Sequence, residues 1–174
     1  MMPFSAYAAS KAAGELMCHA YINTYNADIT IIRPFNIFGI RQREFGFGSV
    51  IPIFFKKAVA NEELMVNGDG LQTRDYLYVD DLIDAYKLIV KTPQLHKGVV
   101  NVGSGVETSI LWLAERIVQL VGKGKVIHGP ERPGEVRSFT ANPAKIQNYG
   151  WKQKITVEDG LNRYWDWYKG EKGF

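Results

Sequence analysis

The stretch Asp28-Ile29-Thr30-Ile31-Ile32-Arg33-Pro34 decides the fold class, because it is a β-branched run that ends at a proline. An alanine-rich segment, Ser5 to Asn26, precedes it directly and repeats its apolar residues at helical spacing. A continuous apolar strand that follows a helix is typical of a buried strand in a parallel sheet. The sequence therefore predicts an α/β fold.

Helices and strands alternate over the rest of the chain. We expect helices at 49–60 and 109–121, and a third that is capped by Asp80 or Asp81 and runs to Lys91. We also expect a short helix after Asn142-Pro143 and an aromatic last helix capped by Thr156. We expect a strand at 99–102 and a hairpin that joins 64–66 to 73–78 through Asn67-Gly68-Asp69-Gly70. Residues 36–48 are predicted to be a loop, and residues 123–140 to be rich in loops.

Length and composition exclude several classes of protein. The chain has 174 residues, of which 46% are hydrophobic and 22% charged, so it fits one globular domain or most of one. A net charge of +3 is too small to indicate nucleic acid, although it suits an anionic small molecule. No apolar run reaches membrane length and the start lacks a signal-peptide pattern. The single Cys18 indicates a reduced, cytoplasmic protein.

Tyr7 and Lys11 are four residues apart, so both side chains lie on one face of the first predicted helix. A free tyrosine has a pKa of about 10, and a nearby cation lowers it by stabilising the phenolate. Such a pair can accept a proton from a hydroxyl while a hydride leaves the same carbon. The spacing alone is ambiguous, because Tyr168 and Lys172 repeat it in a polar tail where we assign no catalytic role.

Several blocks in fixed order make the Tyr7 and Lys11 pair more specific. These are Tyr7-x-x-Ser10-Lys11, Arg33-Pro34-Phe35-Asn36, Gly68-Asp69-Gly70-Leu71-Gln72-Thr73-Arg74-Asp75-Tyr76, Asn101-Val102-Gly103-Ser104-Gly105 and Arg132-Pro133-Gly134-Glu135. Together they resemble the extended short-chain dehydrogenase/reductases, and more narrowly the NAD-dependent nucleotide-sugar epimerases and dehydratases, UDP-glucose 4-epimerase among them. The resemblance spans nearly the whole chain.

The resemblance implies a redox site that uses NAD. Tyr7 matches the catalytic base of the family. Lys11 matches the lysine that accompanies this base and also contacts the nicotinamide ribose. Pro34 matches the proline beside the nicotinamide. In the family, the tyrosine removes the sugar 4-hydroxyl proton while the C4 hydride goes to NAD, and an epimerase returns the hydride to the other face of the 4-keto sugar.

The resemblance also implies a binding site for a nucleotide sugar. Arg74 and Arg132 match positions that contact the diphosphate, for which arginine forks are suited. The remaining matches are Asn36 on the nucleotide-sugar side, Glu135 on the ribose hydroxyls, and Val50, Ile51 and Pro52 over the base. Taken alone, Pro34 is better explained as a strand stop and Asn36 as an ordinary loop cap.

Three other features are interpreted as structural. Gly103-Ser104-Gly105 follows a strand, but Thr108 replaces the third glycine of a dinucleotide fingerprint, so we interpret it as a turn. The three histidines lack metal-ligand spacing, and we expect no metal site. The aromatic residues of the last helix are interpreted as a core stripe rather than a base-stacking surface.

No glycine-rich dinucleotide loop occurs among the 17 glycines, whereas the family carries that loop upstream of its catalytic tyrosine. The chain therefore resembles the C-terminal part of a Rossmann-type parallel sheet plus a smaller mixed α/β substrate-binding lobe. Residues 1–48 would form the catalytic helix, a late Rossmann strand and the following loop. Residues 49–174 would form mainly the nucleotide-sugar lobe, with 73–107 returning elements to the Rossmann part.

The expected function is that of the C-terminal half of an NAD-dependent nucleotide-sugar 4-epimerase acting on a UDP-sugar, homodimeric in its full-length form. A 4,6-dehydratase or a UDP-glucuronate decarboxylase of the same family is the alternative, since the discriminating residues lie upstream in the family. A non-catalytic nucleotide-sugar-binding module is the alternative from another class. We expect the isolated chain to be inactive and to expose a sheet edge and an apolar face.

Overall fold

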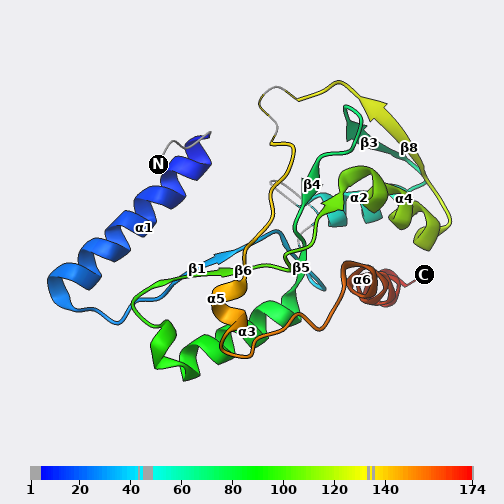
Figure 1. Cartoon of the computed structure of the whole chain (residues 1–174). Helices are drawn as coiled ribbons and strands as arrows, with labels where there is room; N and C mark the ends of the chain where they lie inside the picture. Colours follow the sequence, from blue (N-terminus) through cyan, green and yellow to red (C-terminus); the bar gives the residue numbers. More distant parts are fainter. Residues whose placement is uncertain (1–4, 43, 45–48, 133, 135, 174) are drawn as a thin grey trace.

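The structure is a computed structural model that describes residues 5–42, 44, 49–132, 134 and 136–173 (Figure 1). The helices are α1 (Ala6–Tyr25), α2 (Val50–Val59), α3 (Val79–Lys91), the 3-10 turn η1 (Pro93–Leu95), α4 (Ile110–Val121), α5 (Ala144–Gln147) and α6 (Val157–Lys172). The strands are β1 (Ile31–Pro34), β2 (Ile37–Phe38), β3 (Glu63–Asn67), β4 (Thr73–Arg74), β5 (Leu77–Tyr78), β6 (Val99–Val102), β7 (Thr108–Ser109) and β8 (Lys125–Gly129).

Parallel pairing dominates the strands. β1 pairs with β6, β2 with β5 and β3 with β8, all in parallel, whereas β4 and β7 are antiparallel. Parallel strands need a crossover connection, and helices supply it here, since α3 lies between β1 and β6 in the chain and α4 between β3 and β8. The predicted α/β class is confirmed.

The larger hydrophobic core lies among α2, α4, α6 and β3. Leu64 and Val66 alternate toward it from β3 and are fully buried, while the intervening Met65 is exposed. In α6, Tyr164 and Tyr168 pack on Phe55 of α2, so the predicted core stripe is confirmed. These contacts make the helices and the β3–β8 pair one packed unit.

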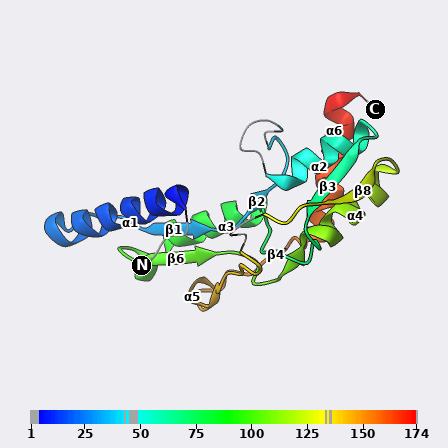
Figure 2. The same cartoon turned by 90° about the horizontal axis from the view of Figure 1, so that it is seen from above.

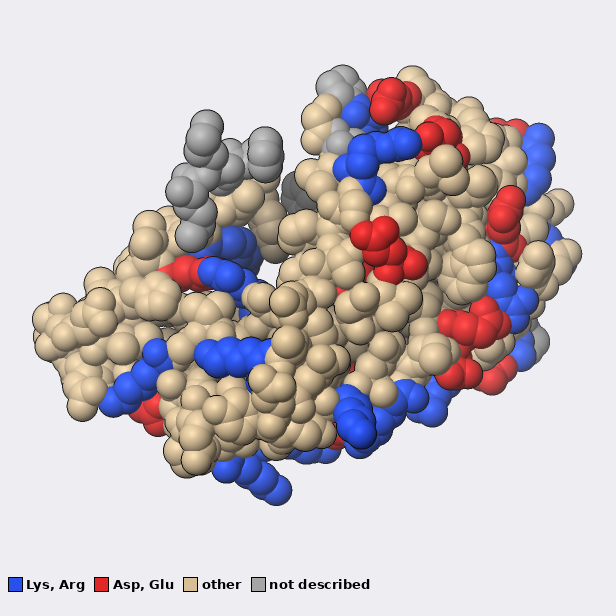
Figure 3. Space-filling view, viewed as in Figure 1, with Lys and Arg blue, Asp and Glu red and all other residues tan. Residues whose placement is uncertain are grey.

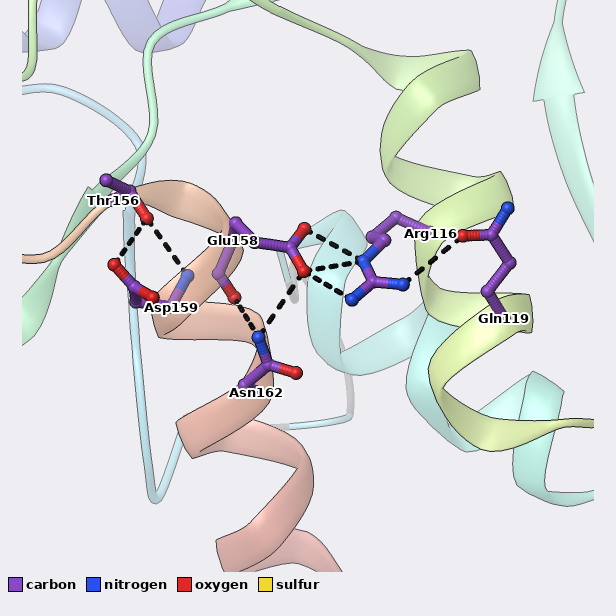
Figure 4. A network of polar contacts seen from close by, with 6 residues as sticks. All are labelled: Arg116, Gln119, Thr156, Glu158, Asp159 and Asn162. Carbon is purple, nitrogen blue, oxygen red and sulfur yellow. Dashed lines mark hydrogen bonds and ion pairs between the residues drawn. The ribbon is translucent and has the colours of Figure 1, made fainter.

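A polar network at the edge of this core joins α4 to α6 (Figure 4). Arg116 Nε donates to both carboxylate oxygens of Glu158 at 2.7 and 2.8 Å, and Arg116 holds the pKa of that carboxyl below its usual value. The Thr156 hydroxyl accepts from Asp159 N at 3.1 Å, so the predicted cap of the last helix is confirmed.

A second core lies under β6, between α3 and α5. Its fully buried members are Leu77, Ala85, Leu95, Val100, Val102 and Ile146. Trp151 belongs to it, and the indole donates to the backbone oxygen of Asp81 at 3.1 Å.

Helix α1 runs beside β1 and covers little of the described chain (Figures 1 and 2). None of its residues is buried, and Leu16 and Met17 are each 63% exposed. Its side chains meet the strand at Glu15, which accepts from Arg33 Nε at 2.8 Å. The helix therefore presents an uncovered apolar surface, as expected for a chain that resembles half of a larger fold.

The predicted hairpin between 64–66 and 73–78 is wrong. Leu64 and Val66 are buried against α2 and α4, and β3 pairs in parallel with β8, the strand that follows α4 in the chain. The residues that have the composition of a hairpin turn form a local side-chain turn instead, in which Asp69 Oδ1 accepts a hydrogen bond from Leu71 N at 2.9 Å. The chain then leaves β3, and β4 pairs with β7.

Three local predictions are also corrected. Helix α3 begins at Val79 with Tyr78 as its cap, so neither Asp80 nor Asp81 caps it. Asp81 is buried and instead accepts from Lys154 N and Ile155 N, both at 3.0 Å, which fixes the segment before α6. The predicted loops contain strands β2 and β8, which are short or half-exposed and so lack a clear apolar run.

Within the described residues, no helix is both long and apolar enough to cross a membrane.

Candidate functional site

A cavity of about 550 Å³ opens between α2, β3 and the extended segment around β4. Its lining residues are Asn36, Ile37, Ser49, Val50, Ile53, Phe54, Lys57, Met65, Asn67, Gln72, Arg74, Tyr76, Ile110 and Arg132. Four residues predicted to bind substrate therefore meet here from distant parts of the chain: Asn36, Val50, Arg74 and Arg132.

One face of α2 forms the apolar wall of the cavity. Val50, Ile53, Phe54 and Lys57 recur at helical spacing and line it. The predicted residues Ile51 and Pro52 are buried in the helix and do not line it. The 3.6-residue period, counted from Val50, would have selected the lining residues.

A two-residue period gives the opposite wall. Gln72, Arg74 and Tyr76 alternate along an extended segment, so their side chains share one face and line the cavity. Gln72 is buried and its Nε2 donates to the backbone oxygen of Asn67 at 3.1 Å. Burial raises the pKa of Tyr76 far above its ordinary value, so this phenol stays neutral. Sequence reasoning selected Arg74 and missed its two alternating neighbours.

The charged residues of the cavity wall are basic. They are Lys57, Arg74 and Arg132, and the described part of the lining contains no acidic residue. By contrast, basic and acidic side chains are interspersed over the face of the molecule seen in Figure 3. A concave site with charges of one sign favours an anionic ligand.

Each of these basic groups donates to at least one neutral oxygen. Arg74 Nη1 donates to the backbone oxygens of Thr73 and Val136, both at 2.7 Å. Lys57 Nζ donates to the Glu63 backbone oxygen at 3.1 Å. With the Asn67 amide oriented so that its oxygen faces Arg132, that oxygen accepts from Arg132 Nε at 2.9 Å and from Nη2 at 3.2 Å.

Residues 136–139 are attached to the rim of the cavity. The backbone oxygens of Arg137 and Phe139 accept from Thr73 N and Asp75 N at 2.8 and 3.2 Å. Arg137 also forms a bidentate pair with Asp69, at 2.9 and 2.8 Å, which lowers the pKa of that carboxyl to about 2. Glu135 lies outside the described residues.

Asn36 is held by the backbone of Asp75, a residue whose own carboxylate is buried. Its Nδ2 donates to the backbone oxygen of Asp75 at 2.8 Å. The Asp75 side chain is fully buried and accepts four hydrogen bonds, from Ser104 N and Oγ, Gly105 N and Ala141 N. The Gly103-Ser104-Gly105 segment thus wraps a carboxylate of its own chain. A Cβ at Gly103 would come within 2.4 Å of the Ala141 Cβ, so this close packing requires glycine.

Tyr7 and Lys11 share a face of α1, as the spacing predicts. Lys11 Nζ lies 5.5 Å from the centroid of the Tyr7 ring, and Tyr7 is 72% exposed. Pro34 is exposed at the carboxyl end of β1. The structure does not place these three residues in the lining of the cavity. In both views, the N-terminal end of α1 is the end nearer to the lobe that contains the cavity (Figures 1 and 2).

The second tyrosine–lysine pair has a different environment. Lys172 Nζ lies 5.7 Å from the centroid of the Tyr168 ring, but Tyr168 is only 3% exposed and packs in the core. Exposure, which the sequence spacing does not reveal, separates the two pairs.

A family model and many known proteins match this chain. The model of the NAD dependent epimerase/dehydratase family matches residues 1–103. A UDP-glucose 4-epimerase from Mycolicibacterium smegmatis is 34% identical over 171 residues, which cover 97% of this chain and 54% of that protein. The chain spans about half the length of the curated relatives it matches.

Solved structures agree with the sequence relatives. The crystal structure of a UDP-glucose 4-epimerase with UDP-glucose, from Thermotoga maritima, matches with a TM-score of 0.89 and 28% identity, over 95% of this chain and 54% of that one. A dTDP-glucose 4,6-dehydratase from Bacillus anthracis, in complex with NAD, matches with a TM-score of 0.85 and 30% identity, over 100% of this chain and 55% of that one.

Proposed function

Because the chain belongs to the NAD-dependent epimerase/dehydratase family, we propose that it is the C-terminal half of an enzyme that acts on a nucleotide sugar at C4, and that its cavity binds the nucleoside diphosphate. The observation that carries this proposal is the cavity lining, which unites Arg74, Arg132 and Lys57 with an apolar helix face. Guanidinium groups suit a diphosphate, and the wall of Val50 and Phe54 suits the flat base.

Within this proposal, each remaining residue has a role in substrate binding. Asn36 contacts the sugar side, and Glu135 accepts from the ribose hydroxyls. Val50 lies against the base, while Ile51 and Pro52 support it from inside α2. Residues 1–48 form the catalytic helix and the late Rossmann strand, and residues 49–174 form mainly the binding lobe. The second core, built on α3, β5 and β6, supports the assignment of 73–107 to the Rossmann part.

The residues present fit one edge of an NAD site. Pro34 ends a parallel strand at its carboxyl end, where dinucleotides bind in such sheets, and Tyr7 and Lys11 share the exposed face of the neighbouring helix. NAD, when bound, accepts the C4 hydride of the sugar and can return it. Lys11 stabilises the Tyr7 phenolate, and Tyr7 takes the proton of the 4-hydroxyl. The glycine-rich loop for the cofactor phosphates belongs to the other half of the fold.

Among the family's reactions, we favour C4 epimerisation of a UDP-sugar, because the matched relatives include UDP-glucose 4-epimerases in sequence and in structure. A 4,6-dehydratase is the second candidate, because a dTDP-glucose 4,6-dehydratase matches the whole chain at a comparable identity. We further propose that the full-length enzyme is a cytoplasmic homodimer.

Arg132→Ala tests the diphosphate site. We expect the chain to bind UDP, and the variant to bind it about tenfold to a hundredfold more weakly, because a charged hydrogen bond to phosphate contributes roughly 1.5 to 3 kcal/mol. Isothermal titration of both proteins with UDP measures the change.

Arg163→Ala is the matched control for that titration. Arg163 lies on α6, contacts Asp80 at 3.8 Å and does not line the cavity, so its loss removes the same charge elsewhere. We expect this variant to bind UDP like the parent chain. Equal weakening by both substitutions would show a non-specific charge effect, and a parent chain that does not bind UDP would reject the proposed site.

A further inference from the structure

We propose that Asn67 is a positioning residue of this cavity: its carboxamide holds the guanidinium of Arg132 by one edge, so that the other edge faces the diphosphate. The inference rests on the proposed function and deepens it, since it names the residue that orients the binding arginine.

Asn67 is itself fixed from two sides. It is the last residue of β3 and is aligned with Gly129, the last residue of β8. Its backbone oxygen accepts from Gln72 Nε2 at 3.1 Å, which joins it to the opposite wall of the cavity. The side chain lines the cavity and is half-buried. Asn67 is therefore a rigid point from which a mobile group can be held.

Arg132 needs such a point, because it lies three residues beyond β8, outside any helix or strand, and is exposed. A free arginine side chain carries about 2 kcal/mol of rotamer entropy, which opposes binding when the side chain is ordered only by its ligand. Hydrogen bonds from Nε at 2.9 Å and Nη2 at 3.2 Å to Asn67 Oδ1 order the guanidinium in advance.

The geometry of the guanidinium decides what remains for a ligand. Its five N–H groups lie in one plane, and the side edge, Nε with Nη2, faces Asn67. The end edge, formed by Nη1 and the second hydrogen of Nη2, is not used by Asn67. A bidentate contact with phosphate oxygens requires such an edge.

The chemistry of the partner also matters, because an amide oxygen orients a cation without neutralising it. Elsewhere in the described chain, Arg33 and Arg116 are paired with the carboxylates of Glu15 and Glu158. A carboxylate at residue 67 would hold Arg132 equally well but would cancel its charge and repel a diphosphate. Asparagine meets both requirements of the site.

The test is a double-mutant cycle in the 174-residue chain, read by titration with UDP and with uridine. We expect Asn67→Ala to weaken UDP binding about fivefold to tenfold in the parent chain and less than twofold in the Arg132→Ala background. Uridine binding stays unchanged in both, because uridine lacks the phosphates. Asn67→Asp keeps an acceptor and the side-chain shape, and we expect it to weaken UDP binding at least as much as Asn67→Ala.

Each other outcome overturns the inference in an identifiable way. If Asn67→Ala weakens UDP binding equally with and without Arg132, Asn67 does not act through the arginine. If it weakens uridine as much as UDP, Asn67 contacts the nucleoside instead. UDP binding by Asn67→Asp at the parent affinity would contradict the need for a neutral partner. Loss of affinity in Arg132→Ala but not in Asn67→Ala rejects this inference alone, whereas no UDP binding by the parent chain rejects the proposed function with it.

Discussion

In the full-length enzyme, Tyr7→Phe is expected to reduce turnover of the nucleotide sugar by a factor of at least about 10² to 10⁴, the usual contribution of a positioned acid–base group. The substitution removes only the hydroxyl that takes the proton. UDP affinity should not change, because Tyr7 does not line the cavity. Little change in stability is expected either, because the substitution keeps the aromatic ring and removes a single hydroxyl. Steady-state kinetics and a UDP titration on the same preparation measure the two effects separately.

Tyr25→Phe provides a matched control on the same helix. Tyr25 is 71% exposed in the described chain, close to the 72% of Tyr7, but isoleucine, not lysine, stands four residues after it. We expect this variant to turn over substrate at the parent rate. If Tyr7→Phe also retained full turnover, the assignment of Tyr7 as the base would be rejected. A parallel loss in both variants would instead indicate that α1 had been disturbed.

Local features of the fold could be predicted from the sequence because local physics decides them. The helix predicted at 109–121 is observed as Ile110–Val121, with the Ser109 hydroxyl accepting from Trp112 N at 3.2 Å as its cap. The apolar run before Pro34 gives a parallel strand, although only Ile31 of β1 is buried in this chain. A buried strand was expected because its pattern suits cover on both faces, but Ile32 is only half-buried against the second core, and Arg33 and Pro34 are exposed.

Long-range pairing could not be predicted in the same way. Asn67-Gly68-Asp69-Gly70 has the composition of a hairpin turn, yet the partner of β3 is Lys125–Gly129, some 60 residues away. What selects that partner is the burial of Leu64 and Val66 under α4, which is a tertiary effect.

The cavity also depends on contacts between distant parts of the chain. Asn36, Arg74 and Arg132 were expected to converge because the motif blocks and their order resemble those of the family. Their spacing in the sequence gives no reason by itself for residues so far apart to meet. Asn67 was missed because its side chain acts on a residue 65 positions away. No local pattern indicates such a contact.

Asp75→Asn is expected to destabilise the fold by about 3 kcal/mol, because it places an amide N–H₂ where the carboxylate accepts hydrogen bonds from four donors. In either amide orientation, the N–H₂ group faces at least one of the backbone N–H groups of Ser104, Gly105 and Ala141. Buried donors without an acceptor each cost about 1 to 3 kcal/mol. Denaturant unfolding, with the slope checked for two-state behaviour, measures the difference in the free energy of unfolding.

The matched control is Asp69→Asn, six residues earlier in the chain, where the carboxylate is solvent-exposed and paired with Arg137. We expect the control to stay close to the parent in stability, because exposed ion pairs contribute little. Asp75→Asn should in addition weaken UDP binding, since Asn36 is held by the Asp75 backbone oxygen and would shift with it. Equal stability of the two variants would mean that the Gly103-Ser104-Gly105 segment does not depend on the Asp75 carboxylate. A destabilised Asp75→Asn that binds UDP at the parent affinity would instead separate the segment from the site, and Asn36 would then not be positioned through Asp75.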